Sequence, residues 1–221
     1  KNQEDLDTSA KYQATATNPK GVSDIGTIKV KDINGDGVID DVNDRTFIGD
    51  PTPKFTGGIV NSFRYKNFDL AIDMTYSVGG KILNAAKWAY QTNMDGSRVP
   101  LAAALDHWRS EDDPGSGVYP RTETGTTAIG RSVNTQWIEN GSFLAIKNIT
   151  LGYTIPSERL KWLNSFRLYA SVQQAYIFTG YSGMNPEVNV GASDPTAGVG
   201  IDENAYPIPR TFAFGLSASF K

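Results

Sequence analysis

The chain has 221 residues, a formal net charge of −3 and no cysteine. The small negative charge leaves no basic surface for nucleic acid, and no window approaches the roughly 20 apolar residues of a membrane-spanning helix. Without cysteine, the chain forms neither a disulfide nor a thiolate metal site. The chain begins at Lys1 with neither an initiator Met nor a signal peptide, so we expect a processed form or a piece of a longer protein.

The first 54 residues are polar and rich in turn formers, and they carry one pattern of metal-ligand type. DINGDGVIDDVND (32–44) begins with the oxygen-donor spacing of a calcium loop. Asn43 stands where a bidentate carboxylate is expected, and Asp44 comes one residue late. Two interpretations therefore stay open, a structural Ca²⁺ site and an ordinary loop of Asx turns. The residues of the possible site are Asp32, Asn34, Asp36, Val38, Asp40 and Asp44.

The next stretch predicts a β-hairpin, with strands FTGGIVNSFRY (55–65) and FDLAIDMTYSV (68–78) and a turn at KN (66–67). Apolar and polar residues alternate without a break along the second strand, which indicates two different faces. The apolar face carries Phe68, Leu70, Ile72, Met74, Tyr76 and Val78.

A connection of more than fifty residues follows this hairpin. KILNAAKWAYQTNM (81–94) and LAAALDHWRS (101–110) predict short helices, and DDPGSG and TETGTTAIG are typical of loops. His107 is the chain's single histidine, and Asp106 beside it would point another way on a helix, so we predict no catalytic residues and no enzyme.

Strands then resume at SFLAIKNITLGYTI (142–155) and FRLYASVQQAYIFT (166–179). A second long loop leads to a last strand from about Pro207 to Phe220, in which large apolar residues alternate with small or polar ones. The five predicted strands are joined by connections that are short, long, short and long.

This arrangement favours an outer-membrane barrel, in which turns are short on one side and loops long on the other. The predicted strands have 11 to 14 residues, whereas strands of soluble sheets usually have about 5–6 residues. Aromatic residues also cluster near strand ends, where interfacial girdles belong. They are Phe55, Tyr65, Phe68, Tyr76, Tyr153, Phe166 and Phe220. A soluble β-sandwich with long strands stays open as the alternative.

Five blocks agree in order and spacing with one known family. They are DINGDGVIDD…NDRTFIGDPTPKFTGG, HWRSEDDPGSGVYPR, WIENGSFLAIKNITLGYTIP, LYASVQQAYIFTGYSGMNPEV and YPIPRTFAFGLSASF. Together they resemble the C-terminal part of the SusC/RagA family of TonB-dependent outer-membrane transporters, from about residue 24 to the end. Two departures are the stretch 172–176, where members usually carry a Gly-Gln-Asn-Leu-like sequence, and Lys221 after the terminal aromatic.

The resemblance implies an all-β fold, the last five antiparallel strands of a barrel of about 22 strands. It implies a location in the bacterial outer membrane and contact with lipid, with the rest of the barrel and its plug, with TonB and with a SusD-like lipoprotein lid. The implied function is uptake of oligosaccharides or peptides. The expected divisions are an extracellular loop 1–54, a barrel hairpin 55–79, an extracellular loop 80–140, a barrel hairpin 141–179, an extracellular loop 180–205 and a final strand 206–221.

Two groups of residues are expected to serve the transporter. Aromatic residues of the long loops are candidates for contact with cargo in the extracellular vestibule, namely Trp88, Tyr90, Trp108, Tyr119 and Tyr181. The resemblance also implies that aromatic residues of the last strand form the signal for barrel assembly, namely Phe212, Phe214 and Phe220. The alternative function is a secreted, calcium-stabilised β-sandwich that binds carbohydrate. A secreted hydrolase is a weaker rival, because no nucleophile has a recognisable setting.

Overall fold

The computed structural model describes residues 2–12, 25–40, 42–87, 99, 101–121, 134–156, 158, 162–188 and 199–220. The chain forms two compact units, each described by itself below. One unit comprises Lys1–Gly49 and Asn84–Ile138, and the other comprises Asp50–Leu83 and Glu139–Lys221. We call them the loop unit and the strand unit.

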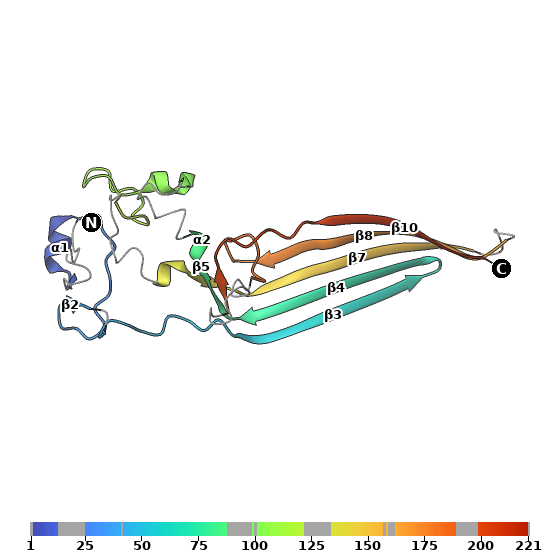
Figure 1. The fold of residues 1–221 in the computed structure, drawn as a ribbon, viewed down its shortest axis with the longest axis horizontal. Coiled ribbons are helices and arrows are strands. Elements are labelled where there is room, and N and C mark those ends of the chain that lie inside the picture. Colours follow the sequence, from blue (N-terminus) through green and yellow to red (C-terminus); the bar gives the residue numbers. More distant parts are fainter. Residues whose placement is uncertain are drawn as a thin grey trace. The chain divides into compact units, whose positions relative to one another are not determined.

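The strand unit is built on a five-stranded antiparallel sheet in the order β10-β8-β7-β4-β3 (Figure 1). Its strands are β3 (Pro53–Tyr65), β4 (Phe68–Gly79), β7 (Phe143–Ile155), β8 (Leu163–Thr179) and β10 (Thr211–Phe220). All five predicted strands are thereby confirmed. The last one begins at Thr211 rather than near Pro207, because proline lacks the N–H that a strand ladder requires.

A two-residue turn at Lys66 and Asn67 joins β3 to β4, as predicted. Lys66 has a φ of 53°, in the left-handed region. A residue in this region lets a two-residue connection follow the twist of the strands that it joins. The hairpin therefore has the two-residue connection that the sequence predicted.

A β-bulge interrupts β7 and β8 halfway along the sheet. Asp73 of β4 pairs with Asn148, but the next residue of β4 pairs with Ile146, so Lys147 is an extra residue in β7. Gln174 of β8, with a φ of 51°, lies at the matching irregularity. The bulge changes which residues of β7 share the apolar face, from even numbers before it to odd numbers after it.

A smaller sheet, in the order β6-β5-β9, contains β5 (Lys81–Asn84), β6 (Ile138–Asn140) and β9 (Ile201–Asp202). The helix predicted at 81–94 is therefore wrong over its first four residues. The described residues that follow form α2 (Ala85–Lys87), and 88–94 lie outside the described residues. The N–H of Leu83 donates to the carbonyl of Gly200, and Ile82 is buried beside Gly141. These tertiary contacts override a helix propensity that is worth only tenths of a kcal/mol per residue.

The loop unit has short elements and a small core. It contains α1 (Gln3–Thr8), the parallel pair β1 (Lys11–Tyr12) and β2 (Val38–Ile39), and the 3₁₀ helices η2 (Ala102–Asp106) and η3 (Thr135–Trp137). η2 is the described form of the helix predicted at 101–110. Ile39, Ala104 and Trp137 are its buried hydrophobic residues. Among the described residues, no helix is long and apolar enough to cross a membrane.

Candidate functional site

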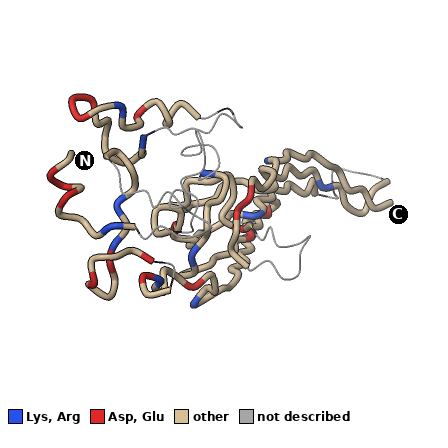
Figure 2. Tube along the Cα trace, turned by 60° about the vertical axis from the view of Figure 1, so that its left-hand side comes forward, with Lys and Arg blue, Asp and Glu red and all other residues tan. Residues whose placement is uncertain are grey.

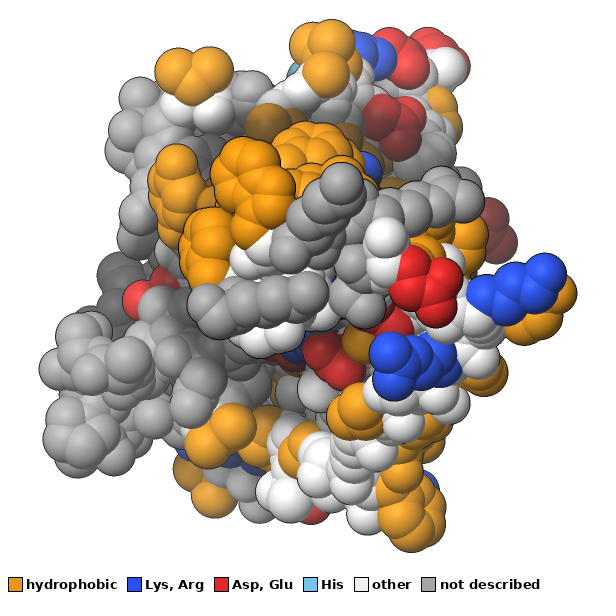
Figure 3. All heavy atoms as spheres, turned by 90° about the vertical axis from the view of Figure 1, so that its right-hand side faces the viewer, with side chains coloured by type: hydrophobic (Ala, Val, Ile, Leu, Met, Phe, Trp, Pro, Cys, Tyr) orange, Lys and Arg blue, Asp and Glu red, His pale blue; other side chains and the backbone are white. Residues whose placement is uncertain are grey.

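The five long strands present one continuous apolar face. The register places apolar residues of neighbouring strands side by side, for example Phe63 with Leu70 and Leu151. Many of these side chains are exposed, up to 83% for Phe214. Figure 3 likewise shows hydrophobic side chains on the surface of the molecule. Members of this face that are more than a third exposed are Phe55, Ile59, Phe63, Tyr65, Phe68, Val78, Leu144, Leu151, Leu168, Tyr176, Phe178, Phe212, Phe214 and Leu216.

Aromatic pairs mark both ends of this face. Phe68 and Tyr153 lie 4.7 Å apart between ring centroids near the β3–β4 turn, and Tyr176 and Phe178 lie 4.7 Å apart near the other end. From Phe68 to Val78, β4 covers about 33 Å along its axis, at about 3.3 Å per residue. At the tilt of barrel strands, about 40°, this corresponds to a height of about 25 Å, the height of the apolar band of an outer-membrane barrel.

The opposite face is polar and carries small side chains. Near the β3–β4 turn, Arg167 of β8 reaches across Gly152 of β7 to Asp69 of β4, with a distance of 3.0 Å between Nε and Oδ1. A Cβ on Gly152 would lie 2.5 Å from that Oδ1. Glycine is therefore required where the ion pair crosses the middle strand.

Side chains also lie flat on this face between Arg167 and β10. The Arg167 guanidinium lies 5.2 Å from the ring centroid of Tyr169, and the Tyr169 ring covers Gly215 of β10. Asp69, Arg167 and Tyr169 thus lie along the sheet over two glycines, spanning four strands. Charged residues are sparse along the strands and more frequent in the loops (Figure 2), and the pair neutralises two of those that do occur.

At the end of the sheet opposite the β3–β4 turn, some residues of the polar face are buried. Ala145 and Ser77 on this face are 0% and 6% exposed, although they are neither large nor strongly apolar. Tyr181 is buried, and its hydroxyl donates to Asp202 Oδ2 at 2.6 Å. Burial, together with the neighbouring carboxylate of Asp202, raises the pKa of Tyr181 far above its usual range, so the phenol stays protonated. On β4 and β7, this end of the sheet therefore buries small residues of the polar face, whereas large side chains of the apolar face are exposed.

The calcium-like loop is closed by hydrogen bonds from its own backbone. Asp32 accepts the N–H groups of Gly35 and Gly37, and Asp44 accepts those of Ile33 and Asp40 at 2.8 Å each. Asp36, Asn34 and Asp40 also accept N–H groups within two or three residues, so the loop is a series of Asx turns.

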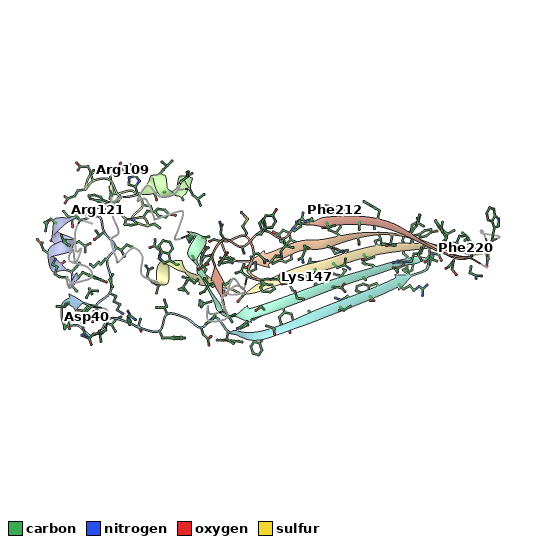
Figure 4. All side chains as sticks on the ribbon, in the orientation of Figure 1. Asp40, Arg109, Arg121, Lys147, Phe212 and Phe220 are labelled. Atoms are coloured by element: carbon green, nitrogen blue, oxygen red, sulfur yellow. The ribbon has the colours of Figure 1, made fainter. Side chains whose placement is uncertain are left out.

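The calcium interpretation of this loop stays a prediction. Across the described part of the chain, no group of three or more His, Cys, Asp or Glu side chains is arranged to hold a metal ion. The N–H groups of Asn43 and Val42 instead hold the pKa of Asp40 below its usual value, so this carboxylate stays charged and bonded at neutral pH. Val38, the expected carbonyl ligand, belongs to β2. Figure 4 shows Asp40 in this part of the loop unit.

An open cavity of about 770 Å³ lies beside this loop, and the sequence did not predict it. Its lining combines charged and apolar side chains, including Asp40, Asp44, Arg45 and the buried Ile39. The lining comes from segments far apart in the chain, since it also includes Tyr12 and Asn134. No local motif could have indicated it.

The structure brings two of the five vestibule candidates together. The N–H of Trp108 donates to the carbonyl of Tyr119 at 3.2 Å, and both residues line a cavity of about 300 Å³. The Trp108 indole packs on Gly26, where a Cβ would lie 2.5 Å from the ring. Tyr181 belongs to the strand unit and is buried as described above. Trp88 and Tyr90 lie outside the described residues.

The three aromatic residues expected to form the assembly signal lie on β10. Figure 4 labels Phe212 and Phe220. Phe212, Phe214 and Phe220 are 64%, 83% and 72% exposed. A register shift separates Ser219 from Phe220. β10 is an edge strand of the five-stranded sheet, and the role of these residues in barrel assembly stays a prediction.

Replacing Asp44 by alanine should open the loop of residues 33–43. The substitution removes the acceptors of two N–H groups that join the two ends of the loop. We expect faster hydrogen exchange in this segment of the full-length protein, by about tenfold, since bonds to charged groups contribute about 1.5–3 kcal/mol. Asp112→Ala, at an exposed position of the same unit, is the control. Unchanged exchange in Asp44→Ala would contradict this account of the loop.

Comparison with known proteins identifies several relatives, although no family model matches the chain. TonB-dependent receptor P3 of Formosa agariphila is 34% identical over 213 residues, which cover 94% of this chain and 20% of that protein. TonB-dependent receptor SusC of Bacteroides thetaiotaomicron is 29% identical over 198 residues, covering 86% and 17%. The chain thus spans about a fifth of the length of the curated relatives it matches.

Solved structures show the same likeness. The RagAB peptide importer in its open-open state aligns with a TM-score of 0.59 and 26% identity, over 76% of this chain and 17% of that chain. In its closed-closed state the TM-score is 0.65, over 82% of this chain and 19% of that chain. The identity there is 23%, so this second alignment supports the fold alone. The relatives are named as receptors and importers, not as enzymes.

Proposed function

The chain belongs to the TonB-dependent receptors of the SusC/RagA type, which are proteins of the outer membrane, and from this premise we propose that it forms part of the wall and extracellular vestibule of a nutrient importer. The two-faced sheet is the observation that carries the proposal. Large apolar side chains are exposed on one face over a height of about 25 Å, as lipid contact requires. Small and polar residues on the other face suit an aqueous interior.

The free edges of the sheet support the view that more strands complete it. β3 and β10 lie at the two edges of the five-stranded sheet. An unpaired backbone group in hydrocarbon costs several kcal/mol, so strands in a membrane close into a barrel. The relatives are about five times longer than this chain, and we propose that the remaining length supplies the other strands of a barrel of about 22.

The transport partners and cargo follow from the resemblance and are likewise proposals. We expect a SusD-like lipoprotein as the lid, TonB as the source of energy, and a plug inside the barrel. Oligosaccharides and peptides are the two cargo classes, and the likeness to a protein described as a peptide importer supports the second. Trp108 and Tyr119, which share one cavity, are the vestibule residues that we propose to contact cargo.

A soluble β-sandwich is the alternative, and it requires a second layer over the apolar face. Within the residues that the structure describes, this face carries Phe63, Phe214 and Leu216 at 58%, 83% and 66% exposure. A soluble monomer rarely exposes a contiguous apolar patch larger than about 300–600 Å². The exposed face therefore favours the barrel.

Calcium binding at residues 32–44 stays a prediction from the sequence. If the loop is only a series of Asx turns, held by its N–H bonds, removal of Ca²⁺ by EGTA leaves hydrogen exchange in this segment unchanged. The measurement is made on the full-length protein with and without added Ca²⁺. Protection that appears only with Ca²⁺, and is lost in Asp32→Ala, would establish a metal site instead.

The proposed function is tested on the complete protein that contains this segment. Purified from its source, it should need detergent, and its denatured mass should be several times the 24.0 kDa of this chain. Deletion of its gene should abolish uptake of at least one cargo in a panel of labelled oligosaccharides and peptides. A protein that is monodisperse in plain buffer would end the barrel interpretation.

A further inference from the structure

The chain that follows β8 turns back along the polar face of the sheet. β8 ends at Thr179, which pairs with Phe143 of β7. Eight residues later, Glu187 forms an ion pair with Lys147, four residues further along β7. Four residues of strand correspond to about 13 Å. We call residues 180–188 the return segment.

Burial shows which face the return segment covers. Ala145 and Ser77, on the polar face, are 0% and 6% exposed. Their neighbours in sequence on the apolar face, Leu144 and Val78, are 36% and 47% exposed. The hydroxyl oxygen of Thr75, which pairs with Ala145, is also buried. The cover therefore lies on the polar face, over the rows that the return segment passes between Thr179 and Glu187.

Contacts hold the return segment at both ends. At its start, Tyr181 donates to Asp202, and the Ser182 hydroxyl donates to Glu139 Oε1 at 2.7 Å. At its end, Glu187 bonds to Lys147, with side chains that are 20% and 26% exposed. Between them, Asn185 is 5% exposed and accepts the N–H of Glu187 at 2.9 Å. The segment is thus packed as a fixed layer.

We propose that the return segment, rather than the strands beneath it, forms the inner surface of the barrel on this half of the sheet. Lys147, which is labelled in Figure 4, is then the positioning residue, and it holds the segment through its ion pair with Glu187. The proposal rests on the proposed function, because only a closed barrel gives the polar face an inside. Cargo would pass exposed residues such as Ser182 and Met184, the latter 75% exposed, and would not reach Ala145.

A thiol at position 145 of the full-length transporter tests this inference. The 221 residues contain no cysteine, so Ala145→Cys adds the only thiol of this part of the chain. In outer-membrane vesicles, we expect it to react slowly with a soluble maleimide. Glu187→Lys, which places two cations together, should raise the rate by on the order of tenfold. The charge swap Lys147→Glu with Glu187→Lys should return the rate to within about threefold of the original.

Matched variants separate a positioning role from a general loss of structure. Glu203→Lys makes the same charge change at an exposed site of the strand unit and should leave the rate unchanged. Heat-modifiable migration on a gel reports whether each barrel has assembled. If the Glu187→Lys barrel does not assemble, Glu187→Gln replaces it in the test. We expect a smaller increase in the maleimide reaction rate, and Lys147→Gln should give the same increase.

Two results would overturn the inference while leaving the proposed function intact. A thiol at position 145 that reacts as fast as one at the exposed position 184 would show that the return segment does not cover the strands. Equal rates with and without the charge changes at 147 and 187 would show that this pair does not hold it. The proposed function itself fails separately, if the parent protein is absent from the outer membrane or imports nothing.

Discussion

Ile59→Arg should strongly reduce the stability of the assembled barrel, whereas Val60→Arg should be tolerated. Both positions lie in the middle of β3, and their side chains are 44% and 73% exposed. Ile59 shares the apolar face with Met74, and Val60 shares the polar face with Asp73. An arginine at the middle of the lipid-facing surface costs about 2–4 kcal/mol. An arginine at position 60 instead faces the interior and lies opposite a carboxylate.

The measurement is a denaturant titration of the full-length transporter in lipid vesicles, together with the amount of protein in the outer membrane. At about 1.4 kcal/mol per factor of ten, the Ile59 variant should shift the folding equilibrium by about 30-fold or more. The two substitutions introduce the same side chain at adjacent β-branched residues, so strand propensity and edge position are matched. Equal loss for both variants, or greater loss for Val60→Arg, would reverse the assignment of the two faces.

Gly215→Val should destabilise the barrel through the ring that covers it. A Cβ on Gly215 would lie 2.6 Å from Cε1 of Tyr169, well inside ordinary contact distance. The ring would have to leave the sheet, and with it the guanidinium of Arg167 that stacks on it. Overpacking of this kind costs about 1–3 kcal/mol. Unfolding of the full-length protein in denaturant measures the loss.

Two comparisons make this prediction specific. Gly58→Ala places a Cβ on the same polar face but 3.5 Å from the Met74 carbonyl, an ordinary contact, so it should be nearly neutral. Tyr169→Ala removes the obstructing ring, so Gly215→Val should cost much less in that background, giving a coupling of about 1 kcal/mol or more. Additive losses would mean that the glycine is required for another reason.

Much of the strand wall could be predicted from local pattern. Strict alternation at 68–78 identifies a strand with two different faces, and the two-residue turn at Lys66 follows from the short gap between the runs at 55–65 and 68–78. Spacing of connections then favours a barrel over a sandwich. These features depend on residues that are close in the chain, and the structure confirms them.

Other features were beyond local pattern. The run from Lys81 to Asn84 has helix formers but becomes β5, because pairing with residues near 140 and 201 satisfies its backbone. The bulge at Lys147 breaks the alternation in β7, and nothing in the neighbouring residues shows where the extra residue falls. Trp108 and Tyr119 share a cavity only because the chain between them folds back on itself.

The sequence by itself determined the period of each strand, the two chemically different faces and the family that the blocks resemble. Only the tertiary structure decided that the polar face has two halves, one with Arg167 lying flat over Gly152 and one covered by the return segment. The physical reason is how far apart in the sequence the interacting residues lie. Alternation is set by the backbone geometry of consecutive residues, whereas an ion pair between Lys147 and Glu187, forty residues apart, requires a register that only the assembled sheet fixes.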